Sequence, residues 1–478
     1  MLLAGHSNDN MKRTYCIAFV ISAFSLLSFI AEAQTKTTIK AWITDPAKQV
    51  YFKQEITEKF SGTLSIDAAT IMIDDKVTYQ SIDGFGFALT GGSAMHLMKM
   101  SAGARAALLK ELFGTDKEQI GTSYLRVSIG ASDLDEKVFS YDDLPAGQTD
   151  TALSHFDLGY DKQYLLPVLK EILKINPSIK LMGSPWSPPV WMKDNQDTRG
   201  GSLLKEYYGV YARYLVKYML AMKREGIHMD ALTVQNEPLH PGNNPSLLML
   251  APDQAAFVKN YLGPAFKKAK INTKIIIYDH NADKPEYPIS ILDDPEAKKY
   301  IDGSAFHMYA GKIDALSKVH DAHPDKNLYF TEQWIGAPGN FSGDISWHIE
   351  NLIIGATRNW AKTVLEWNLA SDAEYKPYTD RGGCKTCLGG VTIEGDQYTK
   401  NPAYYIIAHA ARFVRPGSVR ISSNQMDQVP NVAFKTPSGK MVLIVLNRSK
   451  AVKLIHINYK KQTENMFLEA GAVATYVW

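Results

Sequence analysis

Charge of one sign, cysteine and long apolar runs are all scarce in this chain. Its 478 residues include 52 Lys and Arg against 50 Asp and Glu, which gives a formal net charge of +2. A nucleic-acid-binding protein usually carries a dense basic stripe, and this sequence has none. We therefore expect an uncharged partner and no nucleic acid.

The apolar run at 15–30 is shorter than a comfortable membrane span. Lys12 and Arg13 precede it, and Ala31-Glu32-Ala33 follows it, which is the order of regions in a secretory signal peptide. We predict that residues 1–33 are a signal peptide cleaved after Ala33, with Met11 as the true start. No other membrane span is expected, so the protein should be exported to the periplasm, the cell surface or the medium.

Cysteine is limited to three residues, and removal of the signal peptide leaves only Cys384 and Cys387. A C-x-x-C pair without a second Cys or His pair is a weak zinc signal. In an oxidising compartment we expect a local disulfide between these two residues, with a metal site or a free pair as alternatives.

The composition is that of a globular protein, with 45% hydrophobic residues. From residue 83 to 401, apolar segments typical of strands alternate with longer segments of helical spacing, which predicts a (β/α)₈ barrel. Between them, 204–224 has the clearest amphipathic pattern and should be a helix that packs on the barrel. The eight expected strands are 85–89, 124–129, 180–184, 231–235, 274–278, 304–308, 327–331 and 363–367.

Short strands dominate the two ends of the mature chain. Residues 34–82 contain strand-like runs at 38–44, 63–66 and 70–73, and residues 402–478 contain a helix at 403–413 followed by five strands. The N-terminal strands have no place in the barrel. We predict that 34–82 and 402–478 together form a β-sandwich side domain.

Two glutamates are expected at the carboxyl ends of barrel strands. Glu237 follows a short buried strand that breaks at Pro238, and Glu332 ends another strand with Trp334 close behind. Two carboxylates in one cleft can act as the acid and the nucleophile of a glycoside hydrolase. The alternative for Glu237 alone is a loop residue that caps the next turn.

Other strand ends carry groups that can bind a sugar. Asp133, Asn236 and Asn368 could bind hydroxyls, Trp186 and Trp367 could stack on sugar faces, and Tyr309 could hydrogen-bond a carboxylate. Each also has a structural alternative as a helix cap or a packing residue. Arg126 could be a buried salt-bridge partner, and His280 and His307 could be core imidazoles.

Several motifs resemble glycoside hydrolase family 30, the group that includes lysosomal glucosylceramidases. The match runs in order from about residue 80 to 415. The motifs are Asp83-Gly-Phe-Gly, Leu125-Arg-Val, Ser184-Pro-Trp-Ser-Pro-Pro-Val-Trp-Met-Lys, Gln235-Asn-Glu-Pro, Leu262-Gly-Pro, Phe306-His-Met-Tyr, Thr331-Glu and Glu366-Trp-Asn-Leu-Ala.

The resemblance implies a (β/α)₈ barrel with a β-sandwich, a retaining mechanism, and no metal or organic cofactor. It makes Glu237 the acid/base and Glu332 the nucleophile. We expect the nearby carboxylate to raise the pKa of Glu237. The other matched positions line the sugar-binding subsite, and Trp334 and His307 are expected at an outer subsite. The lining positions are Asp133, Trp186, Asn236, Tyr309, Trp367 and Asn368.

The sequence departs from the glucosylceramidases of that family. Gln333-Trp334 replaces a small residue and Cys after the nucleophile, and His307-Met308-Tyr309 replaces a His-Trp-Tyr. We therefore expect a β-linked glucan, β-1,6-glucan above others, in place of a glucosylceramide. The alternatives are a glucosylceramidase, an enzyme for xylan or galactan, and a carbohydrate-binding barrel without catalysis.

Overall fold

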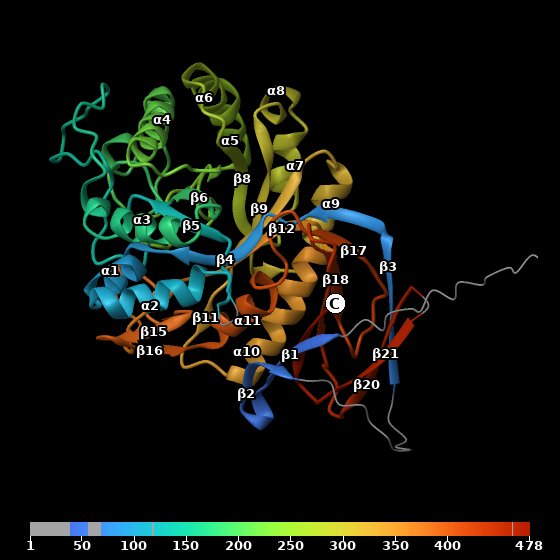
Figure 1. Ribbon diagram of the computed structural model, residues 1–478. Helices are drawn as coiled ribbons and strands as arrows, with labels where there is room; N and C mark the ends of the chain where they lie inside the picture. Colours follow the sequence, from blue (N-terminus) through green and yellow to red (C-terminus); the bar gives the residue numbers. More distant parts are fainter. Residues whose placement is uncertain (1–38, 56–67, 117–118, 461) are drawn as a thin grey trace, which may run out of the picture. The chain divides into compact units, whose positions relative to one another are not determined.

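The computed structural model describes residues 39–55, 68–116, 119–460 and 462–478 (Figure 1). The predicted signal peptide, residues 1–33, and the strand expected at 63–66 lie outside these ranges. Within them, no helix is long and apolar enough to cross a membrane.

Eight parallel strands close into a barrel in the order β10-β12-β4-β5-β6-β7-β8-β9. The predicted fold class is confirmed, although β7 ends two residues early and β8 and β9 extend further than expected. The barrel strands are β4 (Gly84–Leu89), β5 (Tyr124–Ile129), β6 (Lys180–Pro185), β7 (Ala231–Thr233), β8 (Lys274–Ala282), β9 (Ile301–Gly311), β10 (Asn327–Glu332) and β12 (Ala361–Glu366).

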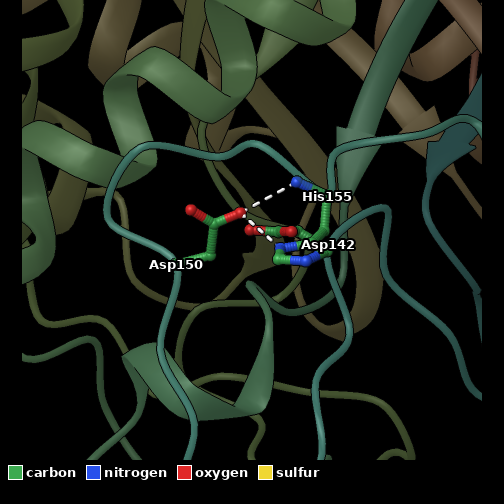
Figure 2. A group of neighbouring side chains, drawn as sticks. All are labelled: Asp142, Asp150 and His155. Carbon is green, nitrogen blue, oxygen red and sulfur yellow. Dashed lines mark hydrogen bonds and ion pairs between the residues drawn. The ribbon is translucent and has the colours of Figure 1, made fainter.

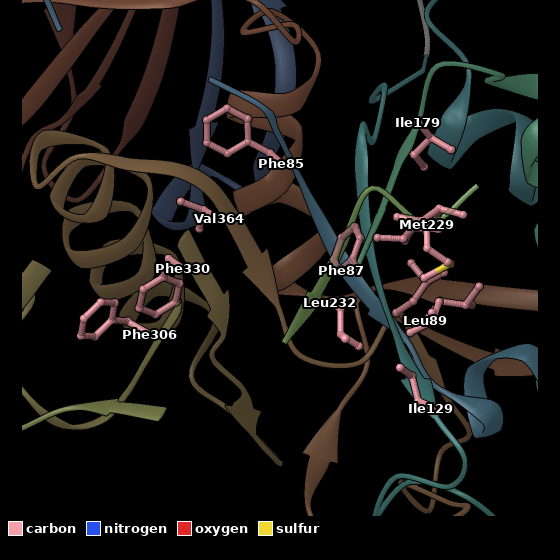
Figure 3. Packing of buried hydrophobic residues seen from close by; sticks show 14 of the residues in the cluster. Phe85, Phe87, Leu89, Ile129, Ile179, Met229, Leu232, Phe306, Phe330 and Val364 are labelled. Atoms are coloured by element: carbon pink, nitrogen blue, oxygen red, sulfur yellow. The ribbon is translucent and has the colours of Figure 1, made fainter. Parts of the chain in front are cut away.

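Side chains alternate between the two faces of each barrel strand. On β4, Phe85, Phe87 and Leu89 belong to a large core that also contains helix residues (Figure 3). Phe330 of β10 and Val364 of β12 join the same core. The outward faces of the strands are therefore covered by helices.

The side chains that point into the barrel change from apolar to polar along the strands. A separate apolar cluster lines the barrel, formed by Tyr124, Met182, Ala231, Ile276, Ala305, Tyr329 and Leu365. Two residues further along β5, β6, β7, β9 and β10 are Arg126, Ser184, Thr233, His307 and Thr331, all buried. Because inward positions repeat every two residues, the interior turns from apolar to polar in one step toward the carboxyl ends.

Helices follow most barrel strands. The amphipathic segment at 204–224 begins with a 3₁₀ turn at Lys205–Tyr207 and continues as α4, whose Leu215, Tyr218 and Met222 are buried as predicted. The α-helices are α1 (Gly91–Lys99), α2 (Ala102–Phe113), α3 (Leu165–Ile175), α4 (Tyr208–Arg224), α5 (Ala251–Phe257), α6 (Gly263–Ala269), α7 (Glu286–Leu292), α8 (Pro295–Lys298), α9 (Ala315–Ala322), α10 (Phe341–His348) and α11 (Pro402–Ala411).

Strands from both ends of the described chain share one nine-stranded sheet, in the order β2-β1-β22-β19-β18-β17-β3-β20-β21. Figure 1 shows the blue strands β1 and β3 beside the red C-terminal strands. The sequence did not predict β2 or β21. The strands are β1 (Lys40–Asp45), β2 (Val50–Glu55), β3 (Ala68–Ser81), β17 (Val419–Ser423), β18 (Asn431–Lys435), β19 (Met441–Leu446), β20 (Lys453–Tyr459), β21 (Gln462–Leu468) and β22 (Val473–Val477).

The two faces of this sheet bury different cores. On β19, Val442 and Ile444 join the large core of the barrel, whereas Leu443 and Val445 join a second core with Ile71 of β3 and Ile455 of β20. This second core gives the β-sandwich domain an interior of its own.

Candidate active site

Arg126, on β5, lies fully buried among polar side chains from four other barrel segments. Its Nη1 donates to Glu332 Oε2 at 2.6 Å, and its Nη2 donates to Asn236 Oδ1 at 2.6 Å and to Asp279 Oδ2 at 2.8 Å. Nη2 also lies 3.1 Å from Ser184 Oγ. One guanidinium therefore orients side chains that are far apart in the sequence.

Asp279, on β8, is the second centre of the network. Besides Arg126, it accepts hydrogen bonds from Ser184 Oγ at 2.8 Å and from Thr331 Oγ1 at 2.7 Å, and His307 Nε2 lies 3.2 Å from its Oδ1. Burial raises the pKa of Asp279, but Arg126 and His307 outweigh burial and hold that pKa below its ordinary value. Asp279 is therefore a buried, ionised carboxylate.

The two predicted glutamates face each other above this network. One carboxylate oxygen of Glu237, one of Glu332 and a ring nitrogen of His307 all lie within 4.8 Å of one another. Both glutamates are more than 90% buried. Arg126 and His307 supply positive charge next to them, so the carboxylates have cationic partners in the protein itself.

His307 carries a proton in this site. Burial alone would lower its pKa, but the surrounding carboxylates, Glu332 first, raise the pKa of His307 to about 9. Its Nδ1 lies 3.0 Å from Glu237 Oε1.

The pKa expected for Glu237 from the sequence was wrong for this structure. Burial raises the pKa of Glu237, but the nearby imidazoles of His280 and His307 outweigh burial and lower it below its ordinary value. The charge of Glu332 alone would raise the pKa of Glu237, but the two imidazoles have the larger effect and lower it.

Aromatic side chains line the candidate active site. The rings of Trp186 and Trp367 are stacked with centroids 5.5 Å apart, and the guanidinium carbon of Arg126 lies 4.8 Å from the Trp186 ring. Tyr309, on β9, donates its hydroxyl proton to Glu332 Oε1 at 2.9 Å. Trp334 packs against the cluster that contains both tryptophans.

Asp133 and Asn368 reach the site from two other strand ends. Burial, followed by the charges of Glu332 and Glu237, raises the pKa of Asp133 to about 8. Asn368 Oδ1 accepts hydrogen bonds from Ser93 Oγ at 2.7 Å and Thr90 Oγ1 at 3.1 Å, so its amide is held in one orientation.

The segment that carries the two cysteines also borders the site. Cys384 and Cys387 form a disulfide, and Cys387 packs in the same cluster as Trp186 and Trp367. Cys387 begins β14 (Cys387–Leu388), which pairs with β11 (Ile335–Gly336), three residues after Glu332.

His307 requires a correction of its predicted place. His307 was expected at an outer subsite, but the side chain is fully buried and bridges Glu237 and Asp279. An inward position on β9 directs the imidazole beneath the carboxylates, because the inward layer of the barrel is polar at this level.

Other residues of the network were missed or underweighted. Asp279 and Ser184 were not among the predicted site residues, and Arg126 was considered only as a buried salt-bridge partner. The available signal was a charged residue in the middle of an apolar strand, since Arg126 interrupts Tyr124-Leu-Arg-Val. A charge there requires buried partners from neighbouring strands.

The backbone around the site adopts an uncommon conformation. Glu237, Asp279 and Asn368 have positive φ angles of 43°, 64° and 65°. Left-handed conformations are unfavourable for residues with a Cβ atom and persist where surrounding contacts hold them, often at functional sites.

Comparison with known proteins agrees with this geometry. The glycosyl hydrolase family 30 TIM-barrel domain matches residues 82–414, and the family's beta sandwich domain matches residues 417–476. The chain belongs to glycoside hydrolase family 30.

Other members of family 30 resemble this chain along most of their length. An endo-1,6-beta-D-glucanase, neg1, of Aspergillus fumigatus is 34% identical over 77% of this chain and 78% of that protein. The lysosomal acid glucosylceramidase of Mus musculus is 29% identical over 84% of this chain and 81% of that protein. The solved structure of the endo-beta1,6-glucanase BT3312 has a TM-score of 0.84 and 33% identity, and covers 92% of this chain and 99% of that chain.

As a family 30 enzyme, this protein is a retaining glycoside hydrolase, and its carboxylate spacing agrees with that mechanism. Retaining enzymes hold the two carboxyl groups roughly 5–5.5 Å apart, whereas inverting enzymes need roughly 6.5–9.5 Å to admit a water molecule. One oxygen of Glu237 and one of Glu332 lie within 4.8 Å of each other, which agrees with the shorter, retaining spacing.

Substitution of Arg126 by methionine should destabilise this family 30 hydrolase. Asp279 and Glu332 would lose their buried cationic partner, and we expect the free energy of unfolding to fall by about 3–5 kcal/mol. Urea denaturation followed by circular dichroism measures the change.

The control for that experiment is Arg381→Met, which breaks the exposed ion pair with Asp197. We expect a much smaller change in unfolding midpoint there, because water already solvates both charges. Equal midpoints for Arg126→Met and wild type would contradict the account of the network.

Proposed function

We propose that this enzyme hydrolyses β-1,6-linked glucan, with Glu332 as the nucleophile and Glu237 as the acid/base. The observation that carries the assignment of roles is the pair of buried carboxylates, which differ in their partners. Glu332 is held in place by hydrogen bonds from Arg126 and Tyr309, although burial and the charges of Glu237 and Asp279 raise its pKa, whereas Glu237 shares a hydrogen bond with His307, a proton donor.

In the first step, Glu332 attacks the anomeric carbon and the bond from that carbon to the glycosidic oxygen breaks. The departing oxygen takes a proton from Glu237, and the sugar is left as an ester on Glu332. In the second step, water gives a proton to Glu237 and attacks the anomeric carbon, and Glu332 leaves as a carboxylate. The product keeps the β configuration.

His307 is the source of the proton in this proposal. The raised pKa of His307 and the lowered pKa of Glu237 favour the proton on the imidazole. Transfer from Nδ1 to the Glu237 carboxylate, 3.0 Å away, leaves a neutral imidazole and a carboxylic acid ready to donate.

Other predicted residues are suited to bind the sugar before the bond breaks. Asp133 and Asn236 offer acceptors and donors to hydroxyl groups, and the stacked tryptophans offer an apolar face. Trp186 Nε1 is buried and has no hydrogen-bond partner in the described part of the chain, so it can donate to a bound hydroxyl. We assign Asn368 and Tyr309 to the same subsite, and Trp334 to its outer side.

The choice of β-1,6-glucan depends on the relatives. Three curated relatives at 32–35% identity are endo-1,6-beta-D-glucanases, and the glucosylceramidase relatives stand at 28–29%. The residues that follow Glu332, Gln333 and Trp334, also differ from the glucosylceramidase pattern.

Access to an external polysaccharide requires export. We propose that residues 1–33 are cleaved as a signal peptide, which would deliver the mature chain to the compartment that contains the glucan. This part of the proposal depends on the sequence pattern at 12–33.

We predict that the mature chain, residues 34–478, releases oligosaccharides from β-1,6-glucan and not from β-1,3-glucan, xylan or a glucosylceramide. Chromatographic product analysis of the four substrates tests this expectation, and Glu332→Gln, which removes the nucleophile, is the matched control. Glucose from the lipid alone would identify a glucosylceramidase instead. No activity above the control on any substrate would favour a binding protein.

The role of His307 predicts a change in pH dependence. A group with a raised pKa keeps its proton until the pH rises through that pKa, so kcat/KM of the wild type should decline near pH 9. In His307→Gln the alkaline decline should move down by at least about one pH unit, because Glu237 alone then holds the proton. His228→Gln, at an exposed position, should leave the profile unchanged, whereas an unshifted profile in His307→Gln would contradict the proposed proton source.

A further inference from the structure

A second group of ionisable side chains lies in the long connection between β5 and α3. Asp142, Asp150 and His155 come from this connection and share no residue with the active site. Figure 2 shows their side chains turned toward one another. One ligand atom from each lies within 4.8 Å of the others.

Within this group, Asp142 is unusual because its buried carboxylate has no hydrogen-bond partner among the described residues. The residue is 1% exposed, and neither carboxylate oxygen has a hydrogen-bond partner in the described part of the chain. A buried carboxylate without a donor is strongly unfavourable, because it has lost its hydration without compensation. Burial accordingly raises the pKa of Asp142 to about 6, and a bound cation would relieve the same cost.

The neighbouring side chains supply little positive charge directly. Lys217 of α4 lowers the pKa of Asp142 by its charge but donates to the carbonyl oxygen of Leu153. His155 Nδ1 lies 2.9 Å from Asp150 Oδ2, and among the described residues it forms no ion pair with Asp142 within 4.0 Å. The imidazole is two-thirds exposed, so an ion could reach it from solvent.

We propose that Asp142, Asp150 and His155 bind one divalent transition-metal ion, with Zn²⁺ as the probe. An ion among the three would give the buried Asp142 carboxylate a partner, and would replace the proton between His155 Nδ1 and Asp150. Neighbouring tetrahedral ligands with bonds of roughly 2.0–2.2 Å lie roughly 3.3–3.6 Å apart. His155 Nδ1 and Asp150 Oδ2, now 2.9 Å apart, would therefore separate slightly on binding the ion.

The ligand set determines the class of ion. Two carboxylates and one imidazole favour an ion that accepts nitrogen as well as oxygen, such as Zn²⁺ or Mn²⁺. Ca²⁺ takes six to eight oxygen ligands and would gain little from an imidazole.

The site has a structural connection to the rim of the barrel. The carbonyl oxygen of Asp142 accepts a hydrogen bond from Trp191 Nε1 at 2.9 Å, and Trp191 follows β6 in the segment that carries Trp186. A bound ion would therefore fix the connection after β5 against the connection after β6.

Isothermal titration of the full, untagged chain with ZnCl₂ after dialysis against a chelator tests the proposal. We expect one saturable Zn²⁺ per chain, and a loss of affinity of at least about tenfold in Asp142→Asn and in His155→Ala. The matched controls are Asp143→Asn, an exposed carboxylate of the same connection, and His228→Ala, an exposed imidazole elsewhere, and both should bind Zn²⁺ like the wild type.

Three results would overturn the proposal. They are the absence of saturable Zn²⁺ binding, binding that survives Asp142→Asn and therefore belongs to Glu237, His307 and Glu332, and a preference for Ca²⁺ that His155→Ala does not change. His155→Ala carries the test if Asp142→Asn fails to fold, because the His155 side chain is exposed. None of these outcomes depends on the substrate of the enzyme.

Discussion

The buried ion pair between Arg126 and Asp279, 2.8 Å long, is the interaction on which the active site depends. A guanidinium and a carboxylate that are both removed from water must be paired and hydrogen-bonded, or the fold loses several kcal/mol. Here the pair sits at the level where the barrel interior turns polar, and each partner has further contacts to other strands. Arg126 reaches Glu332 and Asn236, and Asp279 holds Thr331 and His307. The network therefore joins β5, β7, β8, β9 and β10 at the height where the chemistry takes place.

The same network separates the two glutamates electrostatically. Glu332 accepts hydrogen bonds from Arg126 and Tyr309, and its pKa is raised by burial despite the nearby charges of Arg126 and His307, whereas Glu237 contacts an imidazole that carries the exchangeable proton. Two carboxylates this close together cannot have the same pKa, and their hydrogen-bond and charged partners determine how the two pKa values differ. The positive φ angles at Glu237 and Asp279 are a local cost of this arrangement, which the surrounding hydrogen bonds offset.

Much of the fold could be predicted from the sequence, because alternating strand and helix patterns are local signals. The eight barrel strands, the helix at α4 and the sharing of one sheet by both ends of the chain follow from apolar periodicity and turn residues. The glutamates could be found because Glu332 ends β10 and Glu237 follows shortly after β7. Arg126 and Asp279 could not be joined in advance, because 153 residues separate them and their meeting depends on the register of β5 against β8. The prediction of His307 at an outer subsite was wrong for a related reason. A shift of one residue along a strand decides whether a side chain points into the barrel or away from it. Strand β21 was missed because its alternating polar residues resemble an exposed loop.

The covalent intermediate on Glu332 is the central claim, and trapping it is the most direct test. The enzyme is incubated with 2-deoxy-2-fluoro-β-D-glucosyl fluoride. The 2-fluoro group slows both chemical steps, but the anomeric fluoride is a good leaving group, so the ester on Glu332 should accumulate. Mass spectrometry of the intact chain and of its peptides should find one fluoroglucosyl group per chain, attached to Glu332. A label on Glu237 or Asp279, or no label together with an α-configured product, would contradict the account.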